Sequence, residues 1–295
     1  MSLSGKKTVL ITGCSDGGIG AAMAKVFLEE GYHVFATLRN ASKVGTLAGL
    51  SNLDILELEV TSEDSIARCA EQVRERTGGT LDILINNAGR AFHMPLLDVD
   101  IKEAKKFYDV NFWSVLAMTQ AFAPMVVNAK GVVVNHSSVV SNLAIAWGGM
   151  YSSSRAAVRQ LSEVMRVELE PLGVRVVTAV IGGVDTPLYA NATQYAFNMP
   201  PDSYYKPVRQ FIEDTRAGKK QPRQEPVDVT ARHLVEDIIS GAKGCIWHGA
   251  TAGSCKWLST WLPLWLLDRL NNGTRGLTEL RKIIMQRVHE RGNDT

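Results

Sequence analysis

The stretch Thr8–Gly20, T-V-L-I-T-G-C-S-D-G-G-I-G, joins a short apolar run to a turn that holds four glycines. The residues that follow place Ile19, Met23 and Phe27 on one face of a helix over 19–30. Glycines let a backbone approach a pyrophosphate closely, and the free N–H groups of a helix N-terminus attract its charge. The stretch therefore predicts a strand–turn–helix unit that binds a dinucleotide, although an ordinary glycine-rich turn would look similar.

The same alternation continues along the first 180 residues. Apolar runs predict strands, and helical spacing with Thr61 as a cap predicts the helices between them. The expected strands are 8–12, 32–37, 53–58, 81–85, 131–136 and 174–180, and the expected helices are 19–30, 61–76, two over 101–127, and 150–170. Strands without polar alternation are covered on both faces. The pattern predicts an α/β chain with one doubly wound parallel sheet, a Rossmann fold.

The remainder is less regular. We expect one domain over 1–295, in which residues 6–190 form the cofactor-binding and catalytic core. The proline-rich segment 187–226 reads as a substrate loop, because long irregular segments in compact domains usually bind ligands. A helix over 227–241, a strand over 244–247 and a helical extension of two segments over 254–295 follow.

Composition excludes several classes of protein. Of the 295 residues 45% are hydrophobic and 21% charged, with a net charge of +2, so nothing favours nucleic acid as a partner. The four cysteines have neither metal-site spacing nor a disulfide pattern, which favours a cytoplasmic protein with reduced thiols. No secretory segment is evident, and no apolar stretch of about 18 residues predicts a membrane-spanning helix.

Polar residues follow the expected strands. Arg39 comes after the second strand, where an arginine suits the 2′-phosphate of NADPH and an acid would suit NADH; a solvated surface arginine is the alternative. Asn86-Asn87-Ala88-Gly89 follows the fourth strand, Asn111 lies on the next helix, and Ser137-Ser138 follows the fifth. Tyr151 lies thirteen residues beyond Ser138, and Arg155 four residues later, on the same helix face.

Together these motifs resemble the short-chain dehydrogenase/reductase family over about residues 6–190: T-G-x-x-x-(G)-G-I-G, N-N-A-G, Asn111, Ser138 and Y-x-x-x-(K). More narrowly, F-A-T-L-R-N, N-N-A-G-R, M-P-L-L-D-V-D and Q-A-F-A-P resemble fungal NADPH-dependent 1-acyldihydroxyacetone-phosphate reductases and 17β-hydroxysteroid dehydrogenases.

The resemblance implies roles for individual residues. Tyr151 would be the general acid, Ser138 would bind the substrate oxygen, Asn111 would hold a relay water, and Arg155 would complete the catalytic set. The implied contacts to NADPH or NADP+ are Gly13, Ser15, Asp16, Gly18, Ile19, Gly20, Arg39, Glu59, Val60, Asn87, Ala88, Gly89, Tyr151, Arg155, Gly182, Val184 and Thr186. Substrate contacts are expected from His93, Trp147 and Tyr189, with further aromatic residues at Tyr195, Phe197, Tyr204 and Tyr205.

Arg155 is the main departure from the family pattern, which has a lysine there. A phenol has an ordinary pKa of about 10 and exchanges protons poorly at neutral pH, and a neighbouring cation of either kind would help it. Arginine is bulkier and effectively never deprotonated, so it cannot pass a proton onward. Smaller departures are a longer glycine turn, Glu59 for the usual aspartate, and Ile181-Gly182 for Pro-Gly.

Three functions stay open. The first is an NADPH-dependent reductase for an apolar ketone or aldehyde of lipid, steroid, polyketide or terpenoid type. The second, motivated by Arg155, is a non-redox isomerase, dehydratase or cyclase of secondary metabolism, and the third is a non-catalytic NADP(H)-binding protein. His136 beside Ser137 does not predict a hydrolase, because strand neighbours point to opposite faces.

The segment Trp257–Leu270 carries three of the six tryptophans. It suits either a helix packed on the body or on a second subunit, or a peripheral membrane anchor, since tryptophan favours the headgroup zone. The resemblance implies association with the endoplasmic reticulum or lipid droplets, and a homodimer or homotetramer formed through the helices that hold Asn111 and Tyr151.

Overall fold

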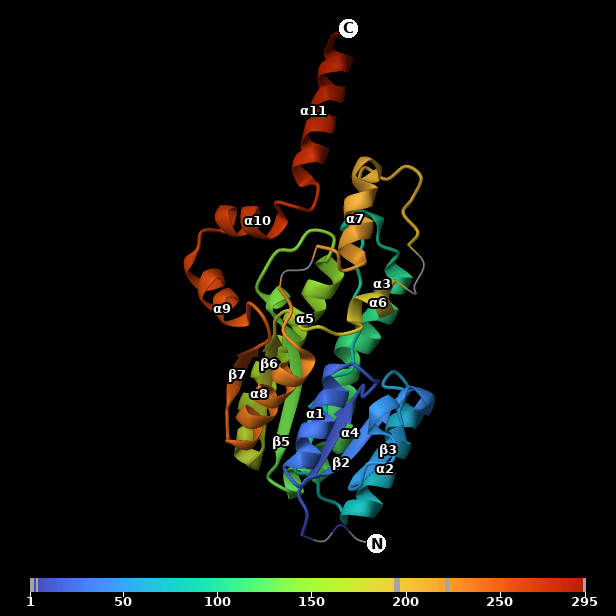
Figure 1. The fold of residues 1–295 in the computed structure, drawn as a ribbon, viewed down its shortest axis with the longest axis vertical. Coiled ribbons are helices and arrows are strands. Elements are labelled where there is room, and N and C mark those ends of the chain that lie inside the picture. The colour runs from blue at the N-terminus through green and yellow to red at the C-terminus, as the bar shows by residue number, and fades with distance from the viewer. Residues whose placement is uncertain (1–2, 4, 194–196, 221–222, 294–295) are drawn as a thin grey trace.

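The computed structural model describes residues 3, 5–193, 197–220 and 223–293, without the side chains of 291–293. Its centre is a sheet of seven parallel strands in the order β3-β2-β1-β4-β5-β6-β7 (Figure 1). The strands are β1 (Thr8–Thr12), β2 (His33–Leu38), β3 (Leu53–Glu57), β4 (Ile83–Asn86), β5 (Val132–Ser138), β6 (Arg175–Ile181) and β7 (Gly244–His248). The predicted doubly wound parallel sheet is confirmed.

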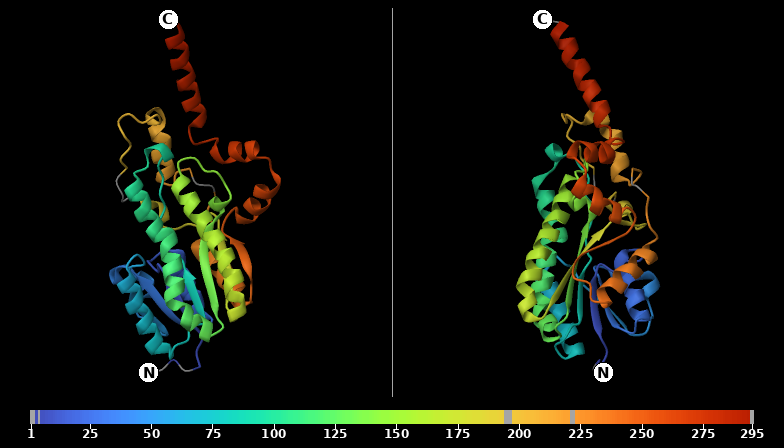
Figure 2. Two further views of the ribbon diagram at one scale, coloured as in Figure 1. Left: turned by 180° about the vertical axis from the view of Figure 1, so that it is seen from behind. Right: turned by 90° about the vertical axis from the view of Figure 1, so that its left-hand side faces the viewer.

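Helices cover both faces of the sheet, as Figure 2 shows in side view. The main ones are α1 (Ile19–Glu29), α2 (Glu63–Thr77), α3 (Ile101–Tyr108), α4 (Ser114–Asn128), α5 (Gly149–Leu169) and α8 (Val227–Ile239). One apolar core forms between the sheet and α1 with α8, where Phe27 and Leu234 are fully buried. A second forms between the sheet and α2, α4 and α5, where Phe122 is fully buried. Side chains of β1, β2, β4 and β5 are buried on both faces, which explains their unbroken apolar runs.

The strand order reverses beside β1, whose neighbours are β2 and β4. In such sheets ligands bind at the carboxyl ends of the strands near this reversal. The glycine turn after β1 and the Asn-Asn-Ala-Gly turn after β4 are therefore adjacent.

Several local expectations need correction. Ser62, not Thr61, caps α2: the Ser62 Oγ accepts a hydrogen bond from the Ser65 N–H, while Thr61 bonds to the Glu59 carboxylate. The described part of the segment 185–226 includes the α-helices α6 (Leu188–Ala192) and α7 (Arg209–Arg216), so it is not irregular throughout. The C-terminal extension has three helices rather than two: α9 (Ala252–Trp261), α10 (Leu264–Asn272) and α11 (Leu277–Asn293).

The extension crosses the carboxyl edge of the sheet before α11 projects away from the body (Figure 1). A small apolar cluster joins it to the rest of the chain: Trp147 and Leu280 pack with Val208 and Ile212 from the segment around α7.

One continuous helical run, Ile101–Asn128, is long and apolar enough to cross a membrane by length and composition alone. The expectation that no such stretch exists is therefore wrong on that measure. The run includes α3 and α4, and its side chains Phe107, Met118 and Phe122 are buried in this structure. Its apolar composition is thus explained by packing against the sheet.

Candidate active site

A cavity of about 1250 Å³ lies along the carboxyl edge of the sheet, from the glycine turn to the C-terminal extension. It brings together most of the residues predicted to act. Those that line it are Gly13, Ser15, Asp16, Gly18, Ile19, Arg39, Glu59, Val60, Asn87, Ala88, Gly89, His93, Ser138, Tyr151, Arg155, Gly182, Val184, Thr186 and Tyr189. Gly20, Asn111 and Trp147 are not among the described lining residues.

At one end of this cavity, hydrogen bonds join the glycine turn after β1 to the Asn-Asn-Ala-Gly turn after β4. Asn87 Nδ2 donates to the carbonyls of Thr12 (2.7 Å) and Gly13 (3.1 Å), and Thr12 Oγ1 accepts from the Ala88 N–H. Gly13 has φ +74°, and a Cβ on it would lie 3.0 Å from the Ala88 Cα. Gly20 is equally constrained, because its Cβ would meet the Asn87 amide. Its role is thus to let the two turns approach.

Cations and a hydroxyl gather where β2 ends. Arg39 is exposed, and its Nη1 lies 3.9 Å from the Glu59 carboxylate. Ser42 and Lys43 also line the cavity, which the sequence reading missed. Asp16 fixes this segment to the glycine turn: its backbone N–H donates to the Lys43 carbonyl, and its carboxylate accepts from Thr46. The bonds from Thr46 lower the pKa of Asp16.

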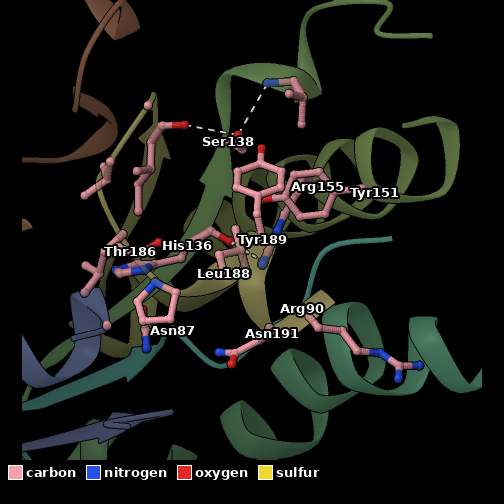
Figure 3. Close-up of a pocket in the computed structure, with 18 of the residues that line it drawn as sticks. Asn87, Arg90, His136, Ser138, Tyr151, Arg155, Thr186, Leu188, Tyr189 and Asn191 are labelled. Atoms are coloured by element: carbon pink, nitrogen blue, oxygen red, sulfur yellow. Dashed lines mark hydrogen bonds between the residues drawn. The ribbon is translucent and has the colours of Figure 1, made fainter. Parts of the chain in front are cut away.

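Ser138 and Tyr151 lie at the other end, on the end of β5 and the first turn of α5. Figure 3 shows the rings of Tyr151 and Tyr189 pointing into the same part of the cavity near Ser138. Ser138 Oγ donates to the Ile181 carbonyl (3.1 Å), so its hydroxyl is held at the wall. Both side chains are nearly buried, at 7% and 8% exposure.

Arg155 is buried beside Tyr151. Its Nη1 donates to the His136 carbonyl (3.0 Å), and its Cζ lies 5.4 Å from the centre of the Tyr151 ring. Nη2 packs against Gly89 so closely that a Cβ there would overlap it. The guanidinium is thus a fixed charge held between strand β5 and the turn at Gly89. Burial, followed by this charge, lowers the pKa of His136 to about 3, so the imidazole is neutral at pH 7.

Asn111 lies on a π-helical turn, Asp109–Trp113, between α3 and α4. Such turns are frequent at functional sites. The side chain is fully buried: Nδ2 donates to the Arg90 carbonyl (3.0 Å) and Ser154 Oγ (3.3 Å), and Oδ1 accepts from the Arg90 N–H. Asn111 therefore joins the segment after Gly89 to α5, behind the cavity wall.

The residues expected to contact substrate divide into two groups. His93 and Tyr189 line the cavity, with ring centres 5.6 Å apart. Trp147 instead packs against Tyr205 and donates its indole N–H to the Arg275 carbonyl (2.9 Å). Tyr204 is exposed, Phe197 packs beside Arg216, and Tyr195 lies outside the described residues.

The extension contributes a wall that the sequence did not predict. Residues Thr251, Ser254, Cys255, Leu258, Leu270, Asn271, Thr274 and Arg275 all line the cavity. No motif marks them, because their role depends on how the extension folds over the edge of the sheet.

Comparison with known proteins identifies the family. Residues 7–196 match the family model described as short chain dehydrogenase. Short-chain dehydrogenase cctT of Talaromyces islandicus is 48% identical over 93% of this chain and 97% of its own. An NADPH-dependent 1-acyldihydroxyacetone phosphate reductase of Schizosaccharomyces pombe is 40% identical, over 72% and 73%.

A solved short chain dehydrogenase from Burkholderia cenocepacia, in complex with NADP, superposes with a TM-score of 0.71 at 24% identity, covering 92% of this chain and 99% of that one. This likeness supports the fold. The chain belongs to the short-chain dehydrogenase family and is an oxidoreductase by that membership.

Proposed function

We propose that the protein is an NADPH-dependent reductase of an apolar ketone or aldehyde. The observation that carries this proposal is the single cavity that joins the glycine turn and its cations to Tyr151 and Ser138. A second cavity, beside Trp113 and Met150, is smaller, at about 400 Å³, and contains none of these groups.

The residues fit a dinucleotide with a 2′-phosphate. Gly18, the N-cap residue before α1, has no side chain to cap the helix. The first N–H groups of α1 are therefore available to a pyrophosphate. Arg39, Ser42 and Lys43 offer two cations and a hydroxyl to a further phosphate. The printed name of the Schizosaccharomyces relative, which includes NADPH, agrees with this choice. NADPH bound here would supply the hydride to the carbonyl carbon.

The protein's own part is to place and protonate the carbonyl oxygen. Ser138 Oγ would turn its one donor hydrogen from the Ile181 carbonyl to this oxygen, and Tyr151 Oη would donate the proton. The Arg155 guanidinium holds a positive charge beside the Tyr151 ring throughout. Since a guanidinium stays protonated, Tyr151 would recover its proton from water in the cavity rather than through Arg155.

The walls around these groups favour an apolar substrate. Val139, Val140, Leu143, Ile145 and Leu188 all line the cavity. Leu258 and Leu270 of the extension are partly exposed and also line it, so an apolar molecule meets apolar side chains on the way in.

Steady-state NADPH oxidation with a panel of ketones and aldehydes tests the proposal. We expect turnover by the wild type and a loss of about a hundredfold or more in kcat for Tyr151→Phe, with NADPH affinity retained. Arg155→Lys should keep or raise kcat. An inactive wild type that Arg155→Lys activates would overturn the proposal of a native reductase.

A non-redox reaction is the second candidate, because Arg155 is held by the His136 carbonyl as a fixed charge that could stabilise an oxyanion. Tyr151 would then act as an acid and base without hydride transfer. A product of unchanged oxidation state, formed without NADPH consumption, would favour this candidate.

We also propose that the chain is cytoplasmic and attaches peripherally to the endoplasmic reticulum or lipid droplets. Trp257, Trp261, Leu264 and Trp265 on α9 and α10 are all strongly exposed. Tryptophans presented together on amphipathic helices suit a membrane surface. Self-association through α4 and α5 is supported by the exposed apolar residues Val164 and Val167 on α5 and Trp113 directly before α4.

A further inference from the structure

Arg275 is a buried cation that the proposed reaction does not use. It follows α10, lines the cavity and is only 6% exposed. Its Nε donates to the Asn271 carbonyl (3.1 Å), whereas Nη1 is buried and has no hydrogen-bond partner in the described residues. No described carboxylate forms an ion pair with it. A buried unpaired guanidinium is costly unless a partner arrives.

Three hydrogen bonds hold Arg275 in position. The Trp147 indole donates to the Arg275 carbonyl, the Ala146 N–H donates to Asn272 Oδ1 (2.8 Å), and Asn272 Nδ2 donates to the Ala144 carbonyl (2.9 Å). These bonds join the extension to the segment between β5 and α5, which directly precedes Tyr151. The position of Arg275 is therefore coupled to the reacting end of the cavity.

The cavity that Arg275 lines carries more cations than acidic side chains. Besides Arg275 the cavity is lined by the cations Arg39, Lys43, Arg90, Arg155 and Lys220, whereas its described acidic residues are Asp16 and Glu59. His93 is neutral, since burial, followed by Arg275 and Arg216, lowers its pKa to about 4.

Tyr189 connects Arg275 with the reacting tyrosine. Burial and then Tyr151 raise the pKa of Tyr189, whereas Arg275 lowers it. Tyr151, Tyr189 and Arg275 line the same cavity, and Figure 3 shows the Tyr189 ring near Tyr151. One molecule in the cavity could therefore contact both Tyr151 and Arg275.

We propose that Arg275 is a specificity residue which binds an anionic group, a carboxylate or a phosphate, at the end of the substrate remote from the carbonyl. This inference rests on the proposed function and narrows it. The substrate is then an amphipathic keto or aldehyde compound with an apolar body and an acidic end. A planar guanidinium with free donors suits both kinds of oxyanion.

Calorimetric titration of the protein–NADPH complex tests this without any turnover, because none of the probes is a ketone or an aldehyde. The probes are decanoate, decyl phosphate and decan-1-ol, which share an apolar chain and differ in the head group. We expect at least one anion to bind about tenfold to a hundredfold more tightly than the alcohol, as a charge-assisted buried hydrogen bond would provide. Whichever anion binds more tightly identifies the head group.

Arg275→Met should remove this preference and leave the affinity for decan-1-ol and NADPH nearly unchanged, and Arg275→Lys should retain part of it. Arg269→Met, an exposed arginine on the same extension, is the matched control and should behave as the wild type. If Arg275→Met loses NADPH binding, the anion preference of Arg275→Lys is compared with that of the wild type instead.

Equal affinities for the three probes, or an anion preference that survives in both Arg275 variants, would overturn the inference. The proposed function fails separately: an intact anion preference in a protein that reduces no carbonyl compound would contradict the reductase alone. Conversely, reduction of apolar ketones with no gain from an acidic end would contradict the role of Arg275 alone.

Discussion

At the scale of single residues, the site depends on how the guanidinium of Arg155 is accommodated at a position where the family pattern has the smaller ammonium group of a lysine. Arg155 occupies the space that the missing side chain of Gly89 leaves, and its Nη1 reaches the His136 carbonyl. Charge beside Tyr151 is therefore retained, while the proton-relay capacity of an amine is not.

Gly89→Ala tests this fit. The added methyl would overlap Nη2 and displace the guanidinium from the His136 carbonyl, so we expect kcat to fall by about tenfold, the value of one charged hydrogen bond. Gly148→Ala is the control, since a Cβ there meets its nearest neighbour at 3.5 Å. Equal activity in the two variants, measured by steady-state kinetics, would show that the position of Arg155 does not matter.

Two buried neutral histidines make stability depend on pH. The folded pKa values of His93 and His136, about 4 and about 3, lie below the ordinary 6.5. Below pH 6.5 the unfolded chain therefore binds more protons than the folded protein. The free energy of unfolding is highest above that pH and falls as the pH falls towards the folded-state pKa values. We expect the free energy of unfolding to fall by about 2 kcal/mol per histidine between pH 7 and pH 5.

Chemical unfolding at several pH values measures this cost. His93→Gln should flatten the curve, because an amide does not titrate, and His233→Gln, at an exposed position, should not. A His93→Gln variant with the same pH slope as the wild type would contradict the burial of a neutral His93.

At the scale of elements, the contact between the segment before α5 and the C-terminal extension shapes the cavity. Trp147→Phe removes the indole donor to the Arg275 carbonyl and keeps an aromatic ring against Tyr205. We expect a loss of about 1 kcal/mol in unfolding free energy. KM should rise more than kcat falls, because the part of the cavity wall formed by the C-terminal extension moves whereas Tyr151 stays in place. An unchanged KM would argue against the extension as part of the site.

The sequence predicted the elements that local chemistry determines. Apolar runs such as Val132–Val134 identify buried parallel strands, and the motifs at Gly13, Asn87, Ser138 and Tyr151 converge because the carboxyl ends of parallel strands share one edge. Arg275 could not be predicted, since its burial depends on hydrogen bonds to residues about 130 positions earlier. Ser62 and Thr61 are chemically alike as caps, so only the backbone distinguishes them.

At the scale of the whole molecule, the exposed tryptophans of α9 and α10 lie on the same extension that walls the cavity. Attachment there to a membrane would place the cavity mouth near an apolar phase. We expect the double variant Trp261→Ser, Trp265→Ser to bind phospholipid vesicles about tenfold less in a flotation assay while NADPH affinity is unchanged. Tyr204→Ser, at an exposed aromatic residue outside the extension, is the control. Equal flotation of both variants would contradict the anchor.

The central claim is that Tyr151 and Arg155 support hydride transfer from NADPH to a carbonyl carbon. Mass spectrometry of the product formed with NADPH deuterated at C4 tests it most directly. The account predicts an alcohol that carries one deuterium on the former carbonyl carbon, formed by the wild type and lost in Tyr151→Phe. A product without deuterium and with unchanged oxidation state, formed equally well in the absence of NADPH, would contradict it.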